Sequence, residues 1–211
     1  MYCLGDMIGI GPFSNEVLDV LFERNNVKMI TGNHDESVLA LLNNEPYPES
    51  RINVKPHHEW IAARLKKEHI SNLENLPRIL NPTIHEHNLH LIHYPMKQSF
   101  NEDHISEDPF DLTGMPSQKN FSVIDGISIF SLVCFGHDHS THHFICNNKT
   151  FFNPGSLGCF NEPFARYGII DINKNGFNVM PQYVPYELNF YVSELSKTSI
   201  PRKEIILNIY R

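Results

Sequence analysis

Four clusters of polar side chains each follow a short apolar segment, and their residue types are those that bind metal ions. Asp6 offers a carboxylate that can bridge two ions, and Asn33 offers a neutral amide oxygen. His93, His137 and His139 offer imidazole nitrogens. This mixture of oxygen and nitrogen ligands suits Mn²⁺, Fe or Zn²⁺ better than Ca²⁺. Because α/β sheets bind ligands beyond the carboxyl ends of their strands, we expect the clusters to meet at one site.

The chemistry that such a site favours is hydrolysis of a phosphate ester. Two metal ions about 3.5–4 Å apart can hold a phosphate and activate a bridging hydroxide for in-line attack. A histidine that is not a ligand can stabilise the developing charge or protonate the leaving oxygen. His34, next to Asn33, is the candidate for this role, and Asp35 is expected to orient its imidazole.

Each cluster taken alone has a simpler interpretation. Gly5-Asp6 after a strand is usually only a turn, and Gly32 to Asp35 can cap a helix. An isolated histidine such as His93 is more often structural than a ligand. A structural zinc site is a weaker alternative, because the cysteines at 3, 134, 146 and 159 form no C-x-x-C pair. The order of the clusters, each after a strand, favours a shared metal site.

The elements that position these residues alternate between strand and helix. Short apolar segments at 2–4, 27–30, 89–93 and 132–135 predict buried strands. Helices are expected from Ser14, after Asp35 and from Pro56, and the tail from Leu188 has helical spacing. Hairpins are predicted at 143–153 and around Asn175-Gly176, and loops at 43–56 and 96–120. This alternation predicts an α/β fold.

Length and charge limit the class of protein. The chain has 211 residues, so we expect one domain over 1–211. A net charge of −7 argues against a groove for nucleic-acid polymers. Scattered cysteines and the lack of an apolar membrane segment or signal peptide predict a cytoplasmic protein without membrane partners. The expected partner is a small phosphorylated substrate, and a homo-oligomer through a sheet edge or the helical tail stays an alternative.

These residues, in this order, resemble the calcineurin-like metallophosphoesterase family. Residues 5–9 match its GDxxG motif, residues 32–35 match GNHD, and His93 is similar to its isolated histidine motif. Residues 136–139 match GHxH, and residues 153–158 resemble the NPGS segment of the small bacterial phosphodiesterase branch. The resemblance covers nearly the whole chain.

The resemblance implies a fold and a role for each motif residue. The fold would be a β-sandwich of two mixed sheets flanked by helices, here without the usual first strand and helix. Asp6 would bridge two metal ions; Asn33, His93 and His137 would complete one site, and His139 would belong to the other. His34 would be the catalytic histidine. Mn²⁺ is the expected metal, with Fe, Zn²⁺ or Ni²⁺ as alternatives.

The sequence departs from the family at its start. The family opens with a strand that ends in D-x-H, but only five residues precede Asp6 and none of them forms this motif. We expect sequence upstream of Met1 to supply it. The first hypothesis is an active phosphodiesterase; candidate substrates are cyclic nucleotides, dinucleoside polyphosphates and simple phosphodiesters. The alternative is a shortened, catalytically impaired domain of the same fold that binds one metal ion or has a regulatory role.

Overall fold

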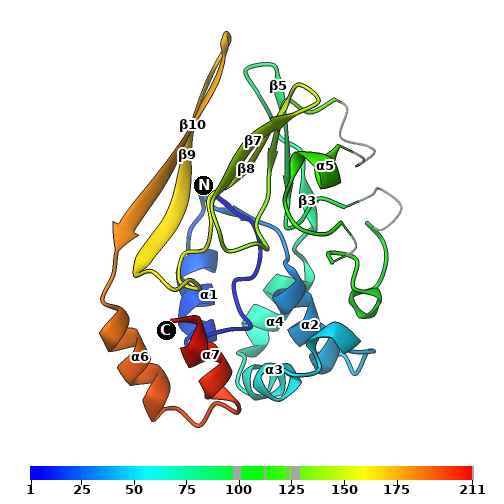
Figure 1. Ribbon diagram of the computed structural model, residues 1–211. Helices are drawn as coiled ribbons and strands as arrows, with labels where there is room; N and C mark the ends of the chain where they lie inside the picture. Colours follow the sequence, from blue (N-terminus) through cyan, green and yellow to red (C-terminus); the bar gives the residue numbers. More distant parts are fainter. Residues whose placement is uncertain (97–100, 112, 123, 125–128, 211) are drawn as a thin grey trace.

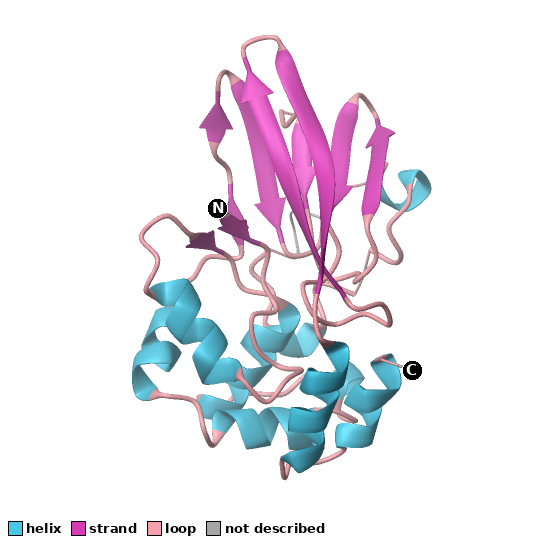
Figure 2. Ribbon diagram, turned by 90° about the vertical axis from the view of Figure 1, so that its left-hand side faces the viewer, coloured by secondary structure: helices cyan, strands magenta, loops and turns pink. Residues whose placement is uncertain are grey.

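The computed structural model describes residues 1–96, 101–111, 113–122, 124 and 129–210. Strands occupy the upper part of the molecule in Figure 2, and most helices lie below them. The loops between the two parts carry the ends of several strands toward the helices. Within the part of the chain that is described, no helix is both long and apolar enough to cross a bilayer.

The largest sheet is mixed. It has six strands in the order β3-β5-β6-β8-β7, with β4 paired to β5. The β5–β6 and β6–β8 pairs are parallel, and the other pairs are antiparallel. Its strands are β3 (Ile79–Leu80), β4 (Thr83–Ile84), β5 (His87–Ile92), β6 (Leu132–Cys134), β7 (His142–Cys146) and β8 (Lys149–Asn153).

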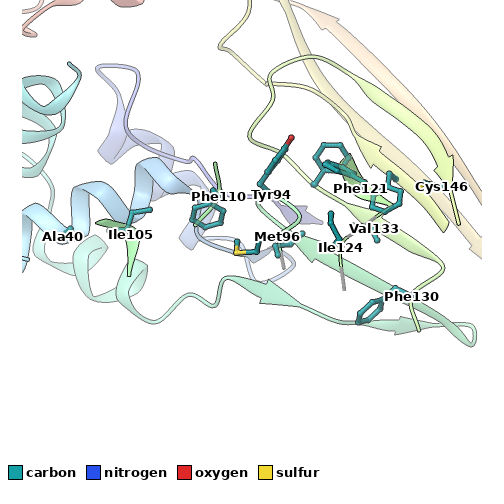
Figure 3. Close-up of a cluster of buried hydrophobic side chains, with 13 residues drawn as sticks. Ala40, Tyr94, Met96, Ile105, Phe110, Phe121, Ile124, Phe130, Val133 and Cys146 are labelled. Atoms are coloured by element: carbon teal, nitrogen blue, oxygen red, sulfur yellow. The ribbon is translucent and has the colours of Figure 1, made fainter. Parts of the chain in front are cut away.

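The central strand β6 is buried on both faces, as its apolar sequence predicts. Leu132 packs in a cluster with Val179 of the hairpin β9 (Phe164–Asn173) and β10 (Gly176–Pro185). Val133 points to a second cluster on the opposite face, with Tyr94 and Phe121 (Figure 3). The hairpin therefore covers one face of the sheet, and Figure 1 shows it beside β7 and β8.

A short parallel pair, β1 (Tyr2–Cys3) and β2 (Lys28–Met29), leads into the helical part. The helices α1 to α4 bury Leu18, Val38, Ile61 and Leu73 in one cluster. The apolar face of each helix packs into this core. Each helix is too short to be stable alone, so it depends on this packing. The helices are α1 (Ser14–Phe22), α2 (Asn33–Leu42), α3 (Lys55–Ala62), α4 (Lys67–Glu74), α5 (Gln118–Phe121), α6 (Leu188–Lys197) and α7 (Lys203–Ile209).

The observed fold is the mixed α/β architecture that the sequence predicts, with mixed sheets flanked by helices. Both hairpins occur; Asn147 and Asn148 turn the first with positive φ angles of 51° and 60°. The segments predicted as loops contain more regular structure than expected. The 43–56 segment contains the 3₁₀ turn η1 (Glu49–Arg51), and 96–120 contains η3 (Ile105–Glu107), while its residues 97–100 and 112 lie outside the described residues.

Candidate metal centre

Four of the five predicted ligands converge beyond the ends of four strands. Asp6 follows β1, Asn33 opens α2 after β2, His93 follows β5, and His137 follows β6. His93 Nε2 lies 3.2 Å from Asp6 Oδ2 and 3.0 Å from Asn33 Oδ1. His137 Nδ1 lies 2.8 Å from the same Asn33 oxygen. Oxygen and nitrogen donors from segments far apart in the sequence therefore face one point.

These donor atoms fit a divalent cation. Ligand atoms about 2.1 Å from one ion lie about 3 Å apart when they are adjacent in an octahedron, and the observed separations match this value. Turning the Asn33 amide over would place its NH₂ group against both imidazoles and its oxygen 2.9 Å from Arg51 Nε. That alternative forms hydrogen bonds without a cation, whereas the orientation with Oδ1 toward the imidazoles is that of a metal ligand.

Both imidazoles are held by hydrogen bonds on the side away from the converging donor atoms. His93 Nδ1 lies 2.7 Å from the carbonyl oxygen of Leu4 and donates to it, which leaves Nε2 with its lone pair toward the site. His137 Nε2 lies 3.2 Å from Asp111 Oδ1, and Asp111 also pairs with Arg51. Outer partners of this kind fix the tautomer of metal-binding histidines. The hydrogen bond from His137 lowers the pKa of Asp111.

Asp111 and Arg51 were not singled out from the sequence. Asp111 lies in the segment predicted as a long acidic loop, and Arg51 lies in the predicted polar loop 43–56. No spacing or motif distinguishes either residue from its polar neighbours. Only the folded chain shows that the two loops meet behind His137.

The carboxylate of Asp35 ties the first loop of the site to α2. It accepts hydrogen bonds from the backbone N–H groups of Asp6 at 2.8 Å, Ile8 at 3.1 Å and Gly32 at 2.9 Å. Asp6 Oδ1 in turn accepts from the N–H of His34 at 2.9 Å. Gly32 has to be glycine, because a Cβ there would lie 2.3 Å from Asp6 Oδ1.

The pKa values of the two carboxyl groups are shifted in opposite directions. Burial alone would raise the pKa of Asp6, but the imidazoles of His93 and His34 bring it far below its ordinary value. Burial and the neighbouring charge of Asp6 raise the pKa of Asp35 to about 7. Asp6 is therefore the ionised carboxylate that a cation would meet.

His34 lies at the edge of the ligand set, and its imidazole is oriented differently from the sequence-based expectation. Its Nδ1 lies 2.9 Å from His58 Nε2, and His58 Nδ1 lies 2.9 Å from the hydroxyl of Tyr47. Asp35, which we expected to orient this ring, uses its carboxylate on backbone N–H groups instead. Burial lowers the pKa of His34 to about 4.

His139 stands apart from the four converging donors. Asp6, His93 and His137 each offer a ligand atom within 4.8 Å of the others, and His139 is not among them. His139 still interacts electrostatically with the group. Burial lowers the pKa of His139, whereas the carboxylate of Asp6 acts in the opposite direction.

The 153–158 segment supports the turn that carries His137. The amide of Asn153 donates to the carbonyl oxygens of Gly136 at 2.9 Å and Asp138 at 2.6 Å. Its own oxygen accepts from the N–H of Gly155 at 2.8 Å. The backbone of His137 has a positive φ of 64°, so this clamp holds a conformation that a β-carbon disfavours. The motif thus has a structural role beside the site.

The alternative zinc site has no support in the described part of the chain. No group of three potential metal-binding side chains there includes a cysteine. A second group, Asp19, Glu68 and His69, joins α1 to α4, but both carboxylate oxygens of Asp19 lie 2.7 Å from Lys66 Nζ.

Comparison with known proteins agrees with the fold. Residues 1–175 match the model of the calcineurin-like phosphoesterase superfamily domain. A hypothetical protein of Pyrococcus horikoshii OT3 is similar in structure, with a TM-score of 0.77, 18% identity and coverage of 100% of this chain and 84% of that chain. A metallophosphoesterase of Sphaerobacter thermophilus gives 0.70 and 18%, with 98% and 85% covered. No curated protein matches the sequence.

Proposed function

The chain belongs to the calcineurin-like phosphoesterase superfamily, and from this membership we propose that it is a metal-dependent hydrolase of small phosphodiesters. The observation that carries the proposal is the convergence of Asp6, Asn33, His93 and His137 at separations of 2.8–3.2 Å. Water adds to phosphorus as hydroxide, the bond to the leaving alcohol breaks, and the alcohol takes a proton. The products are a phosphomonoester and an alcohol.

The four residues would hold one divalent ion, with Mn²⁺ as the proposed metal. A bound ion supplies positive charge to the phosphate and lowers the pKa of a water molecule. Asp6 and His139 would provide the ligands of a second ion. Membership of the superfamily supports this assignment. The mixture of carboxylate, amide and imidazole donors supports it as well.

His34 is the proposed proton donor to the leaving oxygen. Its backbone N–H is fixed on Asp6 Oδ1 and its Nδ1 on His58, so Nε2 is the ring atom left to take the proton that the attacking water loses and to pass it to the leaving oxygen. Proton transfer of this kind contributes roughly 10²–10⁴-fold to rate. Asp35 acts on the same reaction indirectly, because it holds the backbone of Asp6.

The test is turnover of bis(p-nitrophenyl) phosphate by the purified protein with Mn²⁺. Asp6→Ala and His137→Ala should abolish turnover, and a chelator should do the same reversibly. His143→Ala, which removes an exposed imidazole of β7, is the matched control and should keep full activity. No turnover by a folded, metal-loaded sample would refute the assignment.

A second candidate function is a catalytically impaired domain that binds one metal. The short ligand set of the second ion favours it, because only Asp6 and His139 are proposed for that ion against four donors at the first. It predicts one ion per chain by elemental analysis and binding of a phosphate ligand without turnover. Two tightly bound ions together with turnover would exclude it.

A further inference from the structure

Behind His34, two further side chains continue a row of hydrogen bonds. His34 lies on α2, His58 lies on α3, and Tyr47 lies in the loop between these helices. The contacts are 2.9 Å between His34 Nδ1 and His58 Nε2, and 2.9 Å between His58 Nδ1 and the Tyr47 hydroxyl. We propose that His58 is a positioning residue that fixes the tautomer and the ring orientation of His34; this inference rests on the function proposed for His34.

The hydrogen bonds define where each proton lies. The Tyr47 hydroxyl is 3.2 Å from the carbonyl oxygen of Arg51 and donates to it. With its proton used there, the hydroxyl oxygen accepts from Nδ1–H of His58. A neutral His58 then has a lone pair on Nε2, which accepts from Nδ1–H of His34. Only this order satisfies all three contacts, and it leaves Nε2 of His34 as the atom that faces the reaction.

Burial keeps His58 in the neutral form that this order requires. His58 is fully buried, and burial together with the nearby His34 holds the pKa of its imidazole far below the ordinary value. The charged or polar groups that act on it are His34, His57, Asp6 and Arg51. A neutral imidazole with a committed Nδ1–H can act toward His34 only as an acceptor.

The adjacent histidine shows what a buried imidazole looks like without such a role. His57 on the same helix is 4% exposed, and within the described residues neither of its ring nitrogens has a hydrogen-bond partner. It stacks on Trp60 with ring centroids 6.4 Å apart and an interplanar angle of 12°. His57 therefore serves packing, whereas both nitrogens of His58 are used.

The loop that contains Gly9 packs against His34 as well. Gly9 has a φ of +111°, and a Cβ there would lie 2.4 Å from Cβ of His34. The backbone of Gly9 therefore holds His34 on one side while the His58 ring meets it edge-on, with an interplanar angle of 81°. A ring held in this way reaches the leaving oxygen in one orientation.

Steady-state kinetics of four variants test the proposal. His34→Ala should lower kcat for an alkyl phosphodiester by about 100-fold or more, and His58→Leu by about 10-fold, both with little change in KM. His58→Gln should restore most of the activity, because its amide oxygen can replace Nε2 as the acceptor. The double variant His34→Ala/His58→Leu should be no slower than His34→Ala alone.

The leaving group separates positioning from general damage. Because His34 protonates the leaving oxygen, His58→Leu should slow an alkyl ester more than a p-nitrophenyl ester, whose leaving group needs no proton. His57→Phe, the neighbouring buried histidine, is the matched control and should stay within about 2-fold of the wild type for both substrates. An equal loss in the presence and absence of His34 would overturn the proposal.

A measurement that needs no turnover keeps the inference separate from the proposed function. ¹⁵N NMR of the imidazoles should show His34 as the Nδ1–H tautomer in the wild type and as a mixture in His58→Leu. Tyr47→Phe should shift the same balance, and it serves if His58→Leu does not fold. A resting wild-type His34 that carries its proton on Nε2 and not on Nδ1 would overturn the positioning role. A wild-type protein that shows the Nδ1–H tautomer but has no phosphodiesterase activity would overturn only the proposed function.

Discussion

At the scale of the residue, the candidate centre depends on the hydrogen-bond partner behind each proposed ligand. The Nε2 of His137 donates toward Asp111, so that Nδ1 presents its lone pair beside the Asn33 oxygen. Asp111 is shared with Arg51, which donates to both oxygens of the carboxylate. A carboxylate behind an imidazole raises the basicity of the ligand and limits the rotation of its ring.

Asp111→Asn should therefore weaken metal binding by about 10–100-fold without unfolding the protein. The amide keeps the shape of the side chain but removes the charge that His137 and Arg51 face. Calorimetric titration of the chelator-treated protein with Mn²⁺ measures the change. Asp108→Asn is the matched control, since Asp108 is three residues away, contacts Ser50 and already has a positive φ of 51° that Asn tolerates. Equal losses in both variants would contradict the role of Asp111.

At the scale of the element, the N-terminus of α2 organises the first two loops. Asn33 and His34 are its first residues, and Asp35 turns back to bind three backbone N–H groups of two separate segments. Asp6 itself has a positive φ of 54°, so its position depends on this clamp. The helix thus places one proposed ligand and the proposed proton donor, and it fixes a second ligand through Asp35.

Asp35→Asn should destabilise the metal-free protein by about 1–3 kcal/mol, because an amide NH₂ would face a backbone donor and leave it unsatisfied. It should also weaken Mn²⁺ binding, since Asp6 loses its support. Urea unfolding in the presence of a chelator measures the first effect, and metal titration measures the second. A metal-free stability equal to that of the wild type would show that the clamp contributes nothing to folding.

At the scale of the whole molecule, buried neutral histidines link stability to pH. Burial lowers the pKa of His57 in the helical part and of His90 in the sheet to about 4. In the unfolded chain both would titrate near 6.5. Between these values the unfolded state binds more protons at these two sites than the folded state, so their contribution to stability falls as the pH drops from about 7 toward 4.

His57→Phe should remove one of these contributions. The phenyl ring can keep the stacking on Trp60, and it does not titrate. Relative to the wild type, the variant should gain about 2 kcal/mol of unfolding free energy when the pH is lowered from 7 to 5. Urea unfolding at the two pH values, monitored by the fluorescence of Trp60, measures the difference. A pH dependence identical to that of the wild type would show that His57 is protonated in the folded state.

Residues at strand ends could be placed from the sequence, whereas their partners elsewhere in the chain could not. Asp6, Asn33, His93 and His137 could be predicted to meet because each follows an apolar segment that had to be a buried strand, and such strands end at a common edge. The partners of His34 and His137 could not be predicted. Tyr47 and Asp111 lie in segments predicted as loops, and the helix expected from Pro56 does not by itself show what His58 contacts. Their positions follow from how the helices and loops pack.

The sequence by itself determined the fold class, the family and the residues that gather at the centre, because these depend on local apolar patterns and on motifs written along the chain. Tertiary structure alone decided that Asp35 binds the backbone, that His58 meets His34, that Asp111 stands behind His137 and that His139 stands apart. The physical reason is that a hydrogen bond depends on distances of a few tenths of an ångström, which packing between distant segments sets and local sequence does not encode.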